Sequence, residues 1–239
     1  NRVADLIRAC EEAGIRDKTT FVITTDHGLV TFTKSINANA ALKNEELRGF
    51  EAGIDFAPSE RVSLSLTAFD NRVRNAIANV TIDATTRQRR NVGAVHSQGI
   101  ELGASLRFGA FGLDASLALT DAEVRGSGAS LPLDGMRPAQ TPKLSAGATM
   151  TWRPRPGWTA AVTLRHVGAQ YEDDLQTDVL PAATTLDAYA EIPLSSRFSL
   201  VLRGENLGDE EIVTRNQAGS IDLGAPRTLW AGVKLRLGR

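Results

Sequence analysis

Apolar and polar residues alternate with a period of two along most of this chain. In the segment Leu144–Trp152 every second residue is apolar, and the residues between are small or carry hydroxyl groups. This period is typical of a β-strand with one apolar face and one polar face. About nine segments follow it, at Phe50–Phe56, Val62–Ala68, Ile100–Phe108, Leu113–Leu119, Leu144–Trp152, Ala160–Val167, Leu186–Ile192, Phe198–Leu202 and Leu229–Leu237. The sequence therefore predicts an all-β fold, an antiparallel meander of about nine to ten strands.

The connections between these segments alternate in length. Four are short, at Ala57–Glu60, Gly109–Ala110, Arg153–Gly157 and Pro193–Ser196. The others are long and polar, at about residues 83–91, 120–141, 168–184 and 206–227. Because successive strands of a meander reverse direction, all tight turns gather at one end of the sheet and all long loops at the other. This asymmetry is typical of outer-membrane barrels, so the sequence predicts a partial antiparallel transmembrane β-barrel.

Aromatic residues gather beside the tight turns. They are Phe56, Phe108, Phe111, Trp152, Trp158 and Phe198. Such a cluster is expected of an aromatic girdle at the membrane–water interface. The alternative interpretation is a soluble β-sandwich binding module in which the same aromatics belong to the core. The regular sorting of short and long connections favours the membrane barrel, because soluble meanders rarely show it.

Composition excludes several classes of protein. The formal net charge is −1, which gives no electrostatic basis for binding nucleic acid. The single cysteine, Cys10, excludes a disulfide framework and a cysteine-based metal site. No apolar run reaches about eighteen residues, so a membrane-spanning helix is not expected. In a barrel, the polar face would line an aqueous interior, and the residues expected there are Ser63, Ser65, Thr67, Glu101, Arg107, Asp114, Arg203, Lys234 and Arg236.

Five short segments occur in the order in which one known family carries them. They are Asn39–Gly53, Ala68–Ile77, Arg90–Gly93 followed by Ser97–Leu102, Gly135–Pro142 and Gly204–Glu210. Residues 35–239 thereby resemble the C-terminal barrel portion of TonB-dependent outer-membrane receptors. Each segment alone is a weak signal, but five in order over about 190 residues make the resemblance specific.

The resemblance implies transport and no enzyme activity or cofactor. A protein of this kind lies in the outer membrane of a Gram-negative bacterium. It takes up a scarce ligand, such as a siderophore-like metal chelate, a cobalamin or an oligosaccharide, with energy relayed by the TonB complex through a plug domain. Its partners would be the lipid bilayer, the TonB complex and the small-molecule ligand. Such barrels have about twenty-two strands around a plug, so we expect this chain, with fewer than half the strands and no plug, not to be competent alone.

Residues 1–34 show a different pattern. Apolar residues spaced three and four apart predict a helix near the start, and Thr20–Thr24 predicts a strand that runs into Asp26 and His27. This helix-strand α/β fragment resembles, over residues 1–32, the metal-site segment of alkaline phosphatase superfamily phosphodiesterases. The resemblance implies that Asp26 and His27 bind a zinc ion.

The predicted zinc pair is incomplete. A catalytic zinc requires three or more protein ligands, and the remaining histidines, His96 and His166, lie in the barrel-like segments. We therefore interpret Asp26 and His27 as a remnant, with zinc a cofactor only if the fragment is functional. A metal-dependent phosphodiesterase or phosphatase remnant stays the second alternative. The predicted domains are residues 1–34 and residues 35–239.

Overall fold

The computed structural model describes residues 42–83, 86–217 and 219–236. The predicted helix-strand fragment at residues 1–34, with Asp26 and His27, lies outside the described residues. The division into domains at residues 34 and 35 therefore stays a prediction. Within the described ranges, no helix is long and apolar enough to cross a membrane.

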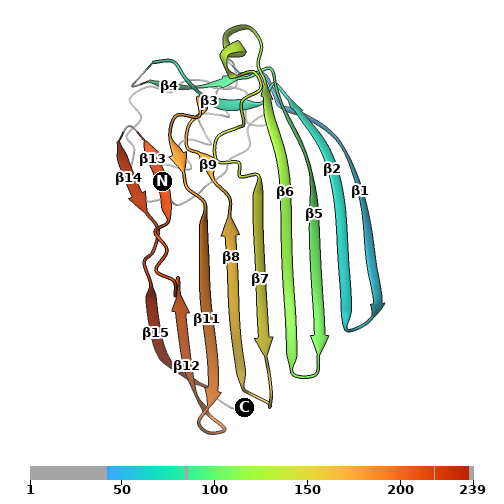
Figure 1. Cartoon of the computed structure of the whole chain (residues 1–239), viewed down its shortest axis with the longest axis vertical. Helices are drawn as coiled ribbons and strands as arrows, with labels where there is room; N and C mark the ends of the chain where they lie inside the picture. Colours follow the sequence, from blue (N-terminus) through green and yellow to red (C-terminus); the bar gives the residue numbers. More distant parts are fainter. Residues whose placement is uncertain (1–41, 84–85, 218, 237–239) are drawn as a thin grey trace, which may run out of the picture. The chain divides into compact units, whose positions relative to one another are not determined.

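The described chain is built around one nine-stranded antiparallel sheet (Figure 1). Its strands follow each other in chain order: β1 (Glu46–Ser59), β2 (Val62–Arg74), β5 (Ala94–Phe108), β6 (Phe111–Arg125), β7 (Leu144–Trp152), β8 (Thr159–Val167), β11 (Ala183–Pro193), β12 (Phe198–Glu205) and β15 (Thr228–Leu235). Each strand overlaps one of the segments with alternating apolar residues. The predicted all-β meander is therefore confirmed.

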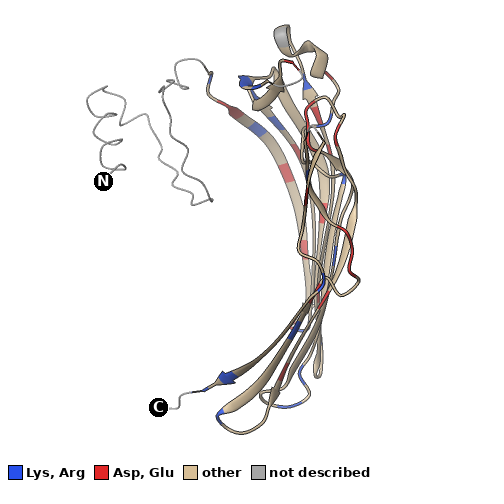
Figure 2. Cartoon of the chain, turned by 90° about the vertical axis from the view of Figure 1, so that its left-hand side faces the viewer, with Lys and Arg blue, Asp and Glu red and all other residues tan. Residues whose placement is uncertain are grey.

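The sheet is open. The strands β1 and β15 lie at its two ends and are each paired with a single neighbour in this sheet. Figure 2 shows that the sheet is curved, with both edge strands bent to the same side of the central strands. An antiparallel sheet that curves without closing is a partial barrel, as predicted.

The connections are sorted by length between the two ends of the sheet. The tight turns β1–β2, β5–β6, β7–β8 and β11–β12 all lie at one end, at the bottom of Figure 1. In the two-residue β5–β6 turn, Gly109 adopts a φ of 58°, in the left-handed region that favours glycine. We call this the turn end, and we call the opposite end, which carries the long connections, the loop end.

The long connections contain structure that the sequence did not predict. Three of them form short two-stranded sheets, β3 (Ile77–Thr81) with β4 (Arg87–Asn91), β9 (Gln170–Tyr171) with β10 (Val179–Leu180), and β13 (Val213–Gln217) with β14 (Ser220–Leu223). The fourth contains a 3-10 helix, η2 (Gly128–Leu133). These elements together are the loop layer.

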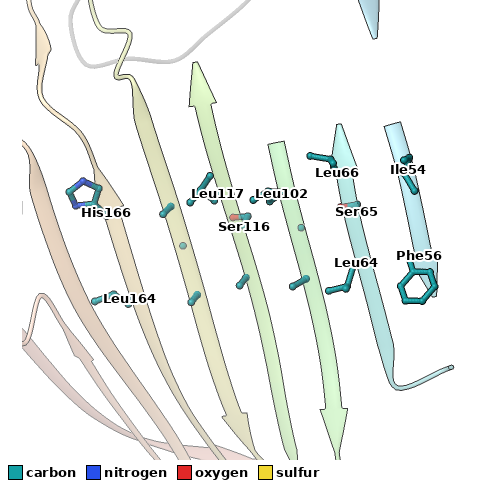
Figure 3. A pocket seen from close by; sticks show the side chains of 16 residues that line it. Ile54, Phe56, Leu64, Ser65, Leu66, Leu102, Ser116, Leu117, Leu164 and His166 are labelled. Atoms are coloured by element: carbon teal, nitrogen blue, oxygen red, sulfur yellow. The ribbon is translucent and has the colours of Figure 1, made fainter. Parts of the chain in front are cut away.

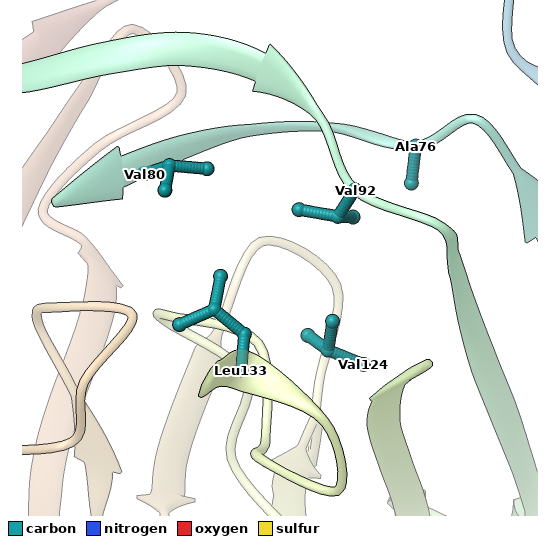
Figure 4. Close-up of a cluster of buried hydrophobic side chains, with 5 residues drawn as sticks. All are labelled: Ala76, Val80, Val92, Val124 and Leu133. Carbon is teal, nitrogen blue, oxygen red and sulfur yellow. The ribbon is translucent and has the colours of Figure 1, made fainter. Parts of the chain in front are cut away.

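The main buried apolar cluster lies at the loop end rather than on the sheet. Ala76, Val80, Val92, Val124 and Leu133 pack together, and each is at most 6% exposed (Figure 4). They come from the β2–β5 connection, which contains β3 and β4, from the end of β6 and from η2. The large apolar side chains of the sheet, in contrast, are widely exposed, and no second described sheet packs on them. This arrangement argues against a soluble sandwich.

Candidate functional site

The nine-stranded sheet has two chemically different faces. Directly paired residues of an antiparallel sheet lie on the same face, so the register defines rows of side chains across the strands. One row consists of Leu66, Leu102, Leu117 and Ala146. The next row, on the opposite face, consists of Ser65, Gly103, Ser116 and Gly147. We call the apolar face the outer face and the polar face the inner face.

The outer face carries a continuous apolar band. Along β5, the residues on this face are Phe108, Leu106, Ala104, Leu102 and Ile100, after which the face becomes polar at Gln98. Eight residue steps of about 3.4 Å give a band about 27 Å long along the strand. At the strand tilt of about 35–45° found in outer-membrane barrels, this length corresponds to a height of about 20 Å, close to their roughly 25 Å apolar band. Leu102 is 43% exposed in this band. The outer face therefore has the extent and composition of a surface that contacts lipid.

A shallow apolar hollow crosses the middle of the outer face (Figure 3). Four alanines of β5, β6 and β7 line it, namely Ala104, Ala115, Ala146 and Ala148. Leu64 and Leu164, labelled in Figure 3, line it from the strands on either side, β2 and β8. The hollow forms because these alanines lie in the same rows as leucines of the neighbouring strands. Since it opens on the lipid-facing surface, we do not assign it to the transported ligand.

An aromatic row lies at the turn end of the outer face. Phe108, Phe111 and Trp152 are direct neighbours on three successive strands. The rings of Phe111 and Trp152 are stacked with centroids 6.3 Å apart. All three residues are at least 42% exposed, as expected of side chains in a membrane interface. The predicted position of these three aromatics, beside the tight turns, is confirmed.

The inner face carries ion pairs, some within one strand and some between strands. Glu191 of β11 accepts hydrogen bonds from Lys234 and Arg236, each at 3.0 Å, across β12. The hydroxyl of Tyr189 donates a further bond to Glu191 at 3.1 Å. Three more pairs, Arg107 with Asp114, Arg165 with Asp187 and Arg203 with Glu205, lie on the same face. The inner face is a polar wall cross-linked by charge.

The register places eight of the nine residues predicted for the aqueous interior on this wall, and the ninth, Arg236, reaches it through its hydrogen bond to Glu191. They include Lys234 and Arg236, but their shared partner Glu191 was not among the predicted residues. The period-two alternation along β11 could have predicted Glu191, because it places this residue on the face opposite to Leu186 and Ile192. The carboxylate side chain is only 9% exposed, because the two cations cover it.

The loop layer is held together by acidic residues of the β9–β10 turn. Asp174 accepts hydrogen bonds from the amide and hydroxyl of Thr81, at 2.8 and 2.5 Å, and so fastens the β3–β4 hairpin. Glu172 accepts a bond from Gln140 at 3.2 Å. Arg87 of β4 lies 3.9 Å from Asp178. The β9–β10 turn is therefore in contact with two other long connections as well as its own.

Asp173 stabilises the turn itself. It is 3% exposed, and its carboxylate accepts bonds from the Thr177 amide, the Thr177 hydroxyl and the Asp178 amide, at 2.9, 2.8 and 2.8 Å. Burial alone would raise the pKa of the Asp173 carboxyl. The hydrogen bonds to the ionised form outweigh burial and hold this pKa below its ordinary value of 3.8.

The described histidines do not form a metal centre. His96, on the outer face, has its Nε2 3.0 Å from Asp70, and His166 has its Nδ1 2.8 Å from the hydroxyl of Thr184. Among the described residues, no group of three or more His, Cys, Asp or Glu side chains is placed to hold a metal ion. Asp26 and His27 are outside these residues, so their predicted role as zinc ligands is untested.

The fold and its two faces define a segment of an outer-membrane-type β-barrel with a loop layer at one end. Comparison with known families agrees. The family described as TonB dependent receptor-like, beta-barrel, matches residues 19–207. This chain belongs to that family, whose members are outer-membrane proteins of Gram-negative bacteria. The match begins inside the fragment predicted at residues 1–34, and none of the comparisons supports its resemblance to phosphodiesterases.

Similar proteins are transport receptors and not enzymes. The metal-pseudopaline receptor CntO of Pseudomonas aeruginosa, in strains UCBPP-PA14 and PAO1, is 29% identical over 214 residues. That alignment covers 83% of this chain but 28% of CntO, so this chain spans less than a third of the relative's length.

Solved structures share the fold. The siderophore receptor PiuA from Acinetobacter baumannii has a TM-score of 0.69 at 24% identity, covering 84% of this chain and 30% of PiuA. The ferric yersiniabactin uptake receptor FyuA from Yersinia pestis has a TM-score of 0.68 at 18% identity, covering 80% of this chain and 30% of FyuA. At these identities the likeness shows the fold alone.

Proposed function

We propose that this chain is part of an outer-membrane receptor that takes up a scarce small-molecule ligand with energy relayed by the TonB complex. One observation carries the proposal: the same strands present an apolar band on one face and an ion-paired polar wall on the other. A barrel wall needs this arrangement to separate lipid from an aqueous interior. The loop layer lies at the end of the wall where an incoming ligand would first make contact.

We further propose a metal chelate as the ligand class. CntO is named as a receptor for metal-pseudopaline, and the structural neighbours include receptors for siderophores and ferric chelates. The expectation of a siderophore-like chelate is therefore preferred over a cobalamin or an oligosaccharide. The partners proposed with it are the lipid bilayer, the TonB complex and a plug domain that closes the barrel.

An uptake experiment tests this function. The complete reading frame that carries this chain is expressed in a Gram-negative host lacking its own chelate receptors, and cells are given radioactive iron, nickel or zinc bound to defined chelators. We expect accumulation of at least one chelated metal, and we expect it to be lost in an otherwise identical tonB deletion strain. Accumulation that is the same with and without the receptor, or with and without TonB, would contradict the proposal.

The predicted binding of zinc by Asp26 and His27 is tested in a separate experiment. A metal-dependent phosphodiesterase would hydrolyse a chromogenic phosphodiester when zinc is supplied, and Asp26→Ala would abolish that hydrolysis. We propose that no such activity is found, because two ligands do not complete a catalytic zinc site. Zinc-dependent hydrolysis by the intact protein, lost on Asp26→Ala, would reverse this interpretation.

A further inference from the structure

The outer face changes from apolar to basic at the loop end of β1 and β2. On β1 the outer-face residues, in order toward the loop end, are Ile54, Ala52, Phe50 and Arg48. On β2, in the same direction, they are Leu66, Ala68, Asp70, Arg72 and Arg74. Arg48 and Arg72 are directly paired across the two strands, and Arg74 is the next residue on the same face. Three arginines therefore sit just beyond the apolar band.

These arginines carry charge that the described residues do not neutralise by ion pairs. All three are exposed, and in the described part of the chain none of them forms an ion pair within 4.0 Å. Like charges that face each other across an antiparallel pair destabilise it. The pairing of Arg48 with Arg72 is therefore unfavourable unless an anion lies between them.

Acidic side chains also lie on this part of the outer face. Asp70 faces His96 at 3.0 Å, and Glu123 pairs with Arg125 and lies 3.8 Å from His96. Asp121 is on β6, two strands from the arginines, and Glu46 is the exposed residue opposite Arg74. Of these four carboxylates, only Glu46 and Asp70 lie on the same two strands as the arginines.

We propose that Arg48, Arg72 and Arg74 bind the phosphate of a lipid headgroup in the outer leaflet of the membrane. Cross-strand neighbours lie about 5 Å apart and same-face neighbours about 7 Å apart, so the three guanidinium groups can reach one phosphate. Guanidinium groups bind phosphate oxygens through paired, charge-assisted hydrogen bonds. Phe50 and Ala68, on the same face below the arginines, are placed against the acyl chains.

The position of the cluster selects a lipid over a free anion. It lies on the face that carries the apolar band and at the level where that band ends, which is where headgroups meet a barrel wall. A soluble phosphate or an anionic ligand would have no reason to bind on this face rather than in the loop layer. The proposal rests on the proposed function in one respect, namely that the outer face contacts lipid.

Lipid binding in detergent tests the proposal. Protein from the complete reading frame is mixed with bisphosphorylated lipid A, with the same lipid after enzymatic removal of its phosphates, or with inorganic phosphate, and bound lipid is counted by native mass spectrometry. An arginine near a membrane surface contributes about fivefold in affinity, so Arg72→Gln should weaken lipid A binding about fivefold and the triple Arg-to-Gln variant about a hundredfold. The dephosphorylated lipid should bind all variants equally, and inorganic phosphate should not compete.

A matched control keeps the result specific. Arg89 is an exposed arginine on β4 of the loop layer, outside the nine-stranded sheet, and Arg89→Gln should leave lipid A binding unchanged. Heat-modifiability on gels verifies that each variant is folded, and Arg72→Lys should restore part of the binding. Unchanged lipid A binding by the folded triple variant would overturn the proposal while leaving the uptake function intact. Failure of the wild-type protein to enter bilayers would overturn both.

Discussion

Thr81 and Asp174 are joined by two hydrogen bonds although 93 residues separate them in the chain. Thr81 ends β3, and Asp174 lies in the turn between β9 and β10, so the contact ties the first long connection to the third. Around it, the buried cluster of Val80, Val92 and Leu133 joins the first connection to η2 in the second. The first three long connections are thus packed together and are not independent loops.

Removing the Asp174 carboxylate should release the β3–β4 hairpin. Asp174→Ala leaves the amide and hydroxyl of Thr81 without their acceptor, a loss of about 1–3 kcal/mol in local stability. Hydrogen exchange at the Thr81 amide should accelerate while exchange in β5 and β6 stays unchanged. Asp174→Asn, which retains one oxygen acceptor, serves as the matched control and should have a smaller effect. Equal exchange at Thr81 in both variants and the wild type would show that the apolar cluster alone holds the hairpin.

The turn at Asp173 should open in acid. Because the folded pKa of the Asp173 carboxyl is below its ordinary value of 3.8, the ionised form stabilises the turn at every pH well above 3.8. That stabilisation is lost as the pH falls from about 3.8 through the folded pKa. Hydrogen exchange at the amides of Thr177 and Asp178 should therefore be constant at neutral pH, after correction for the intrinsic rate, and rise only below pH 3.8. Asp173→Asn should remove this step, and its persistence in that variant would assign it to another carboxyl group.

The nine sheet strands could be predicted from the sequence because alternate side chains of each strand face lipid and water. Each strand therefore carries its own period-two pattern of apolar and polar residues. The segment Leu144–Trp152, for example, is β7 with the predicted bounds. The strands β5 and β6 are longer than predicted, because they continue to Ala94 and Arg125 beyond the apolar band. In this part of the strands the outer-face residues, such as Gln98 and Asp121, are polar, so apolar and polar residues no longer alternate. The backbones of β5 and β6 nevertheless remain paired there.

The candidate site could be predicted only in part. The residues of the inner wall follow from the same alternation, so Lys234 and Arg236 were assigned to the correct face. The β3–β4 hairpin was missed because Arg87–Asn91 is a run of polar residues without any apolar alternation. The contact of Thr81 with Asp174 was beyond prediction, because no local pattern indicates which loop a distant carboxylate will reach.

Glu191 should stabilise the wall more than the other inner-face carboxylates. Glu191→Ala leaves Lys234 and Arg236 facing each other without their shared anion, so we expect it to lower the unfolding free energy more than the loss of an exposed carboxylate does. The control is Asp114→Ala, since that carboxylate is 52% exposed and exposed pairs contribute less than about 1 kcal/mol. Urea unfolding of the complete protein in detergent gives both values. A larger loss for Asp114→Ala than for Glu191→Ala would contradict the ranking.

The open edges of the sheet predict the behaviour of this chain on its own. Each edge strand, β1 and β15, presents unpaired backbone groups, and each such group costs several kcal/mol in lipid. We therefore expect the isolated 239-residue chain neither to insert stably into bilayers nor to transport. Refolding into micelles followed by cold gel electrophoresis is the measurement. A heat-modifiable monomer that also takes up ligand in liposomes would show that the edges can be satisfied without further strands.

The cost of a charge on the outer face should depend on its depth in the apolar band. Leu102 lies inside the band on β5, and an arginine placed near the bilayer midplane of a barrel costs about 2–4 kcal/mol, while one near the interface costs about 0–1 kcal/mol. Leu102→Arg should therefore lower the unfolding free energy of the complete protein in bilayers by about 2–4 kcal/mol. Gln98→Arg, on the same face of the same strand but beyond the band, should cost at most about 1 kcal/mol.

Two comparisons separate this depth effect from a simple loss of packing. Leu102→Ala removes the apolar side chain without adding charge, so its cost should be clearly smaller than that of Leu102→Arg. In bilayers the cost of Leu102→Arg should also exceed that of Ser116→Arg, because Ser116 is on the inner face of the neighbouring strand, where water is available. If the two arginines cost the same, both faces would have the same surroundings, and an outer face that contacts lipid would be excluded.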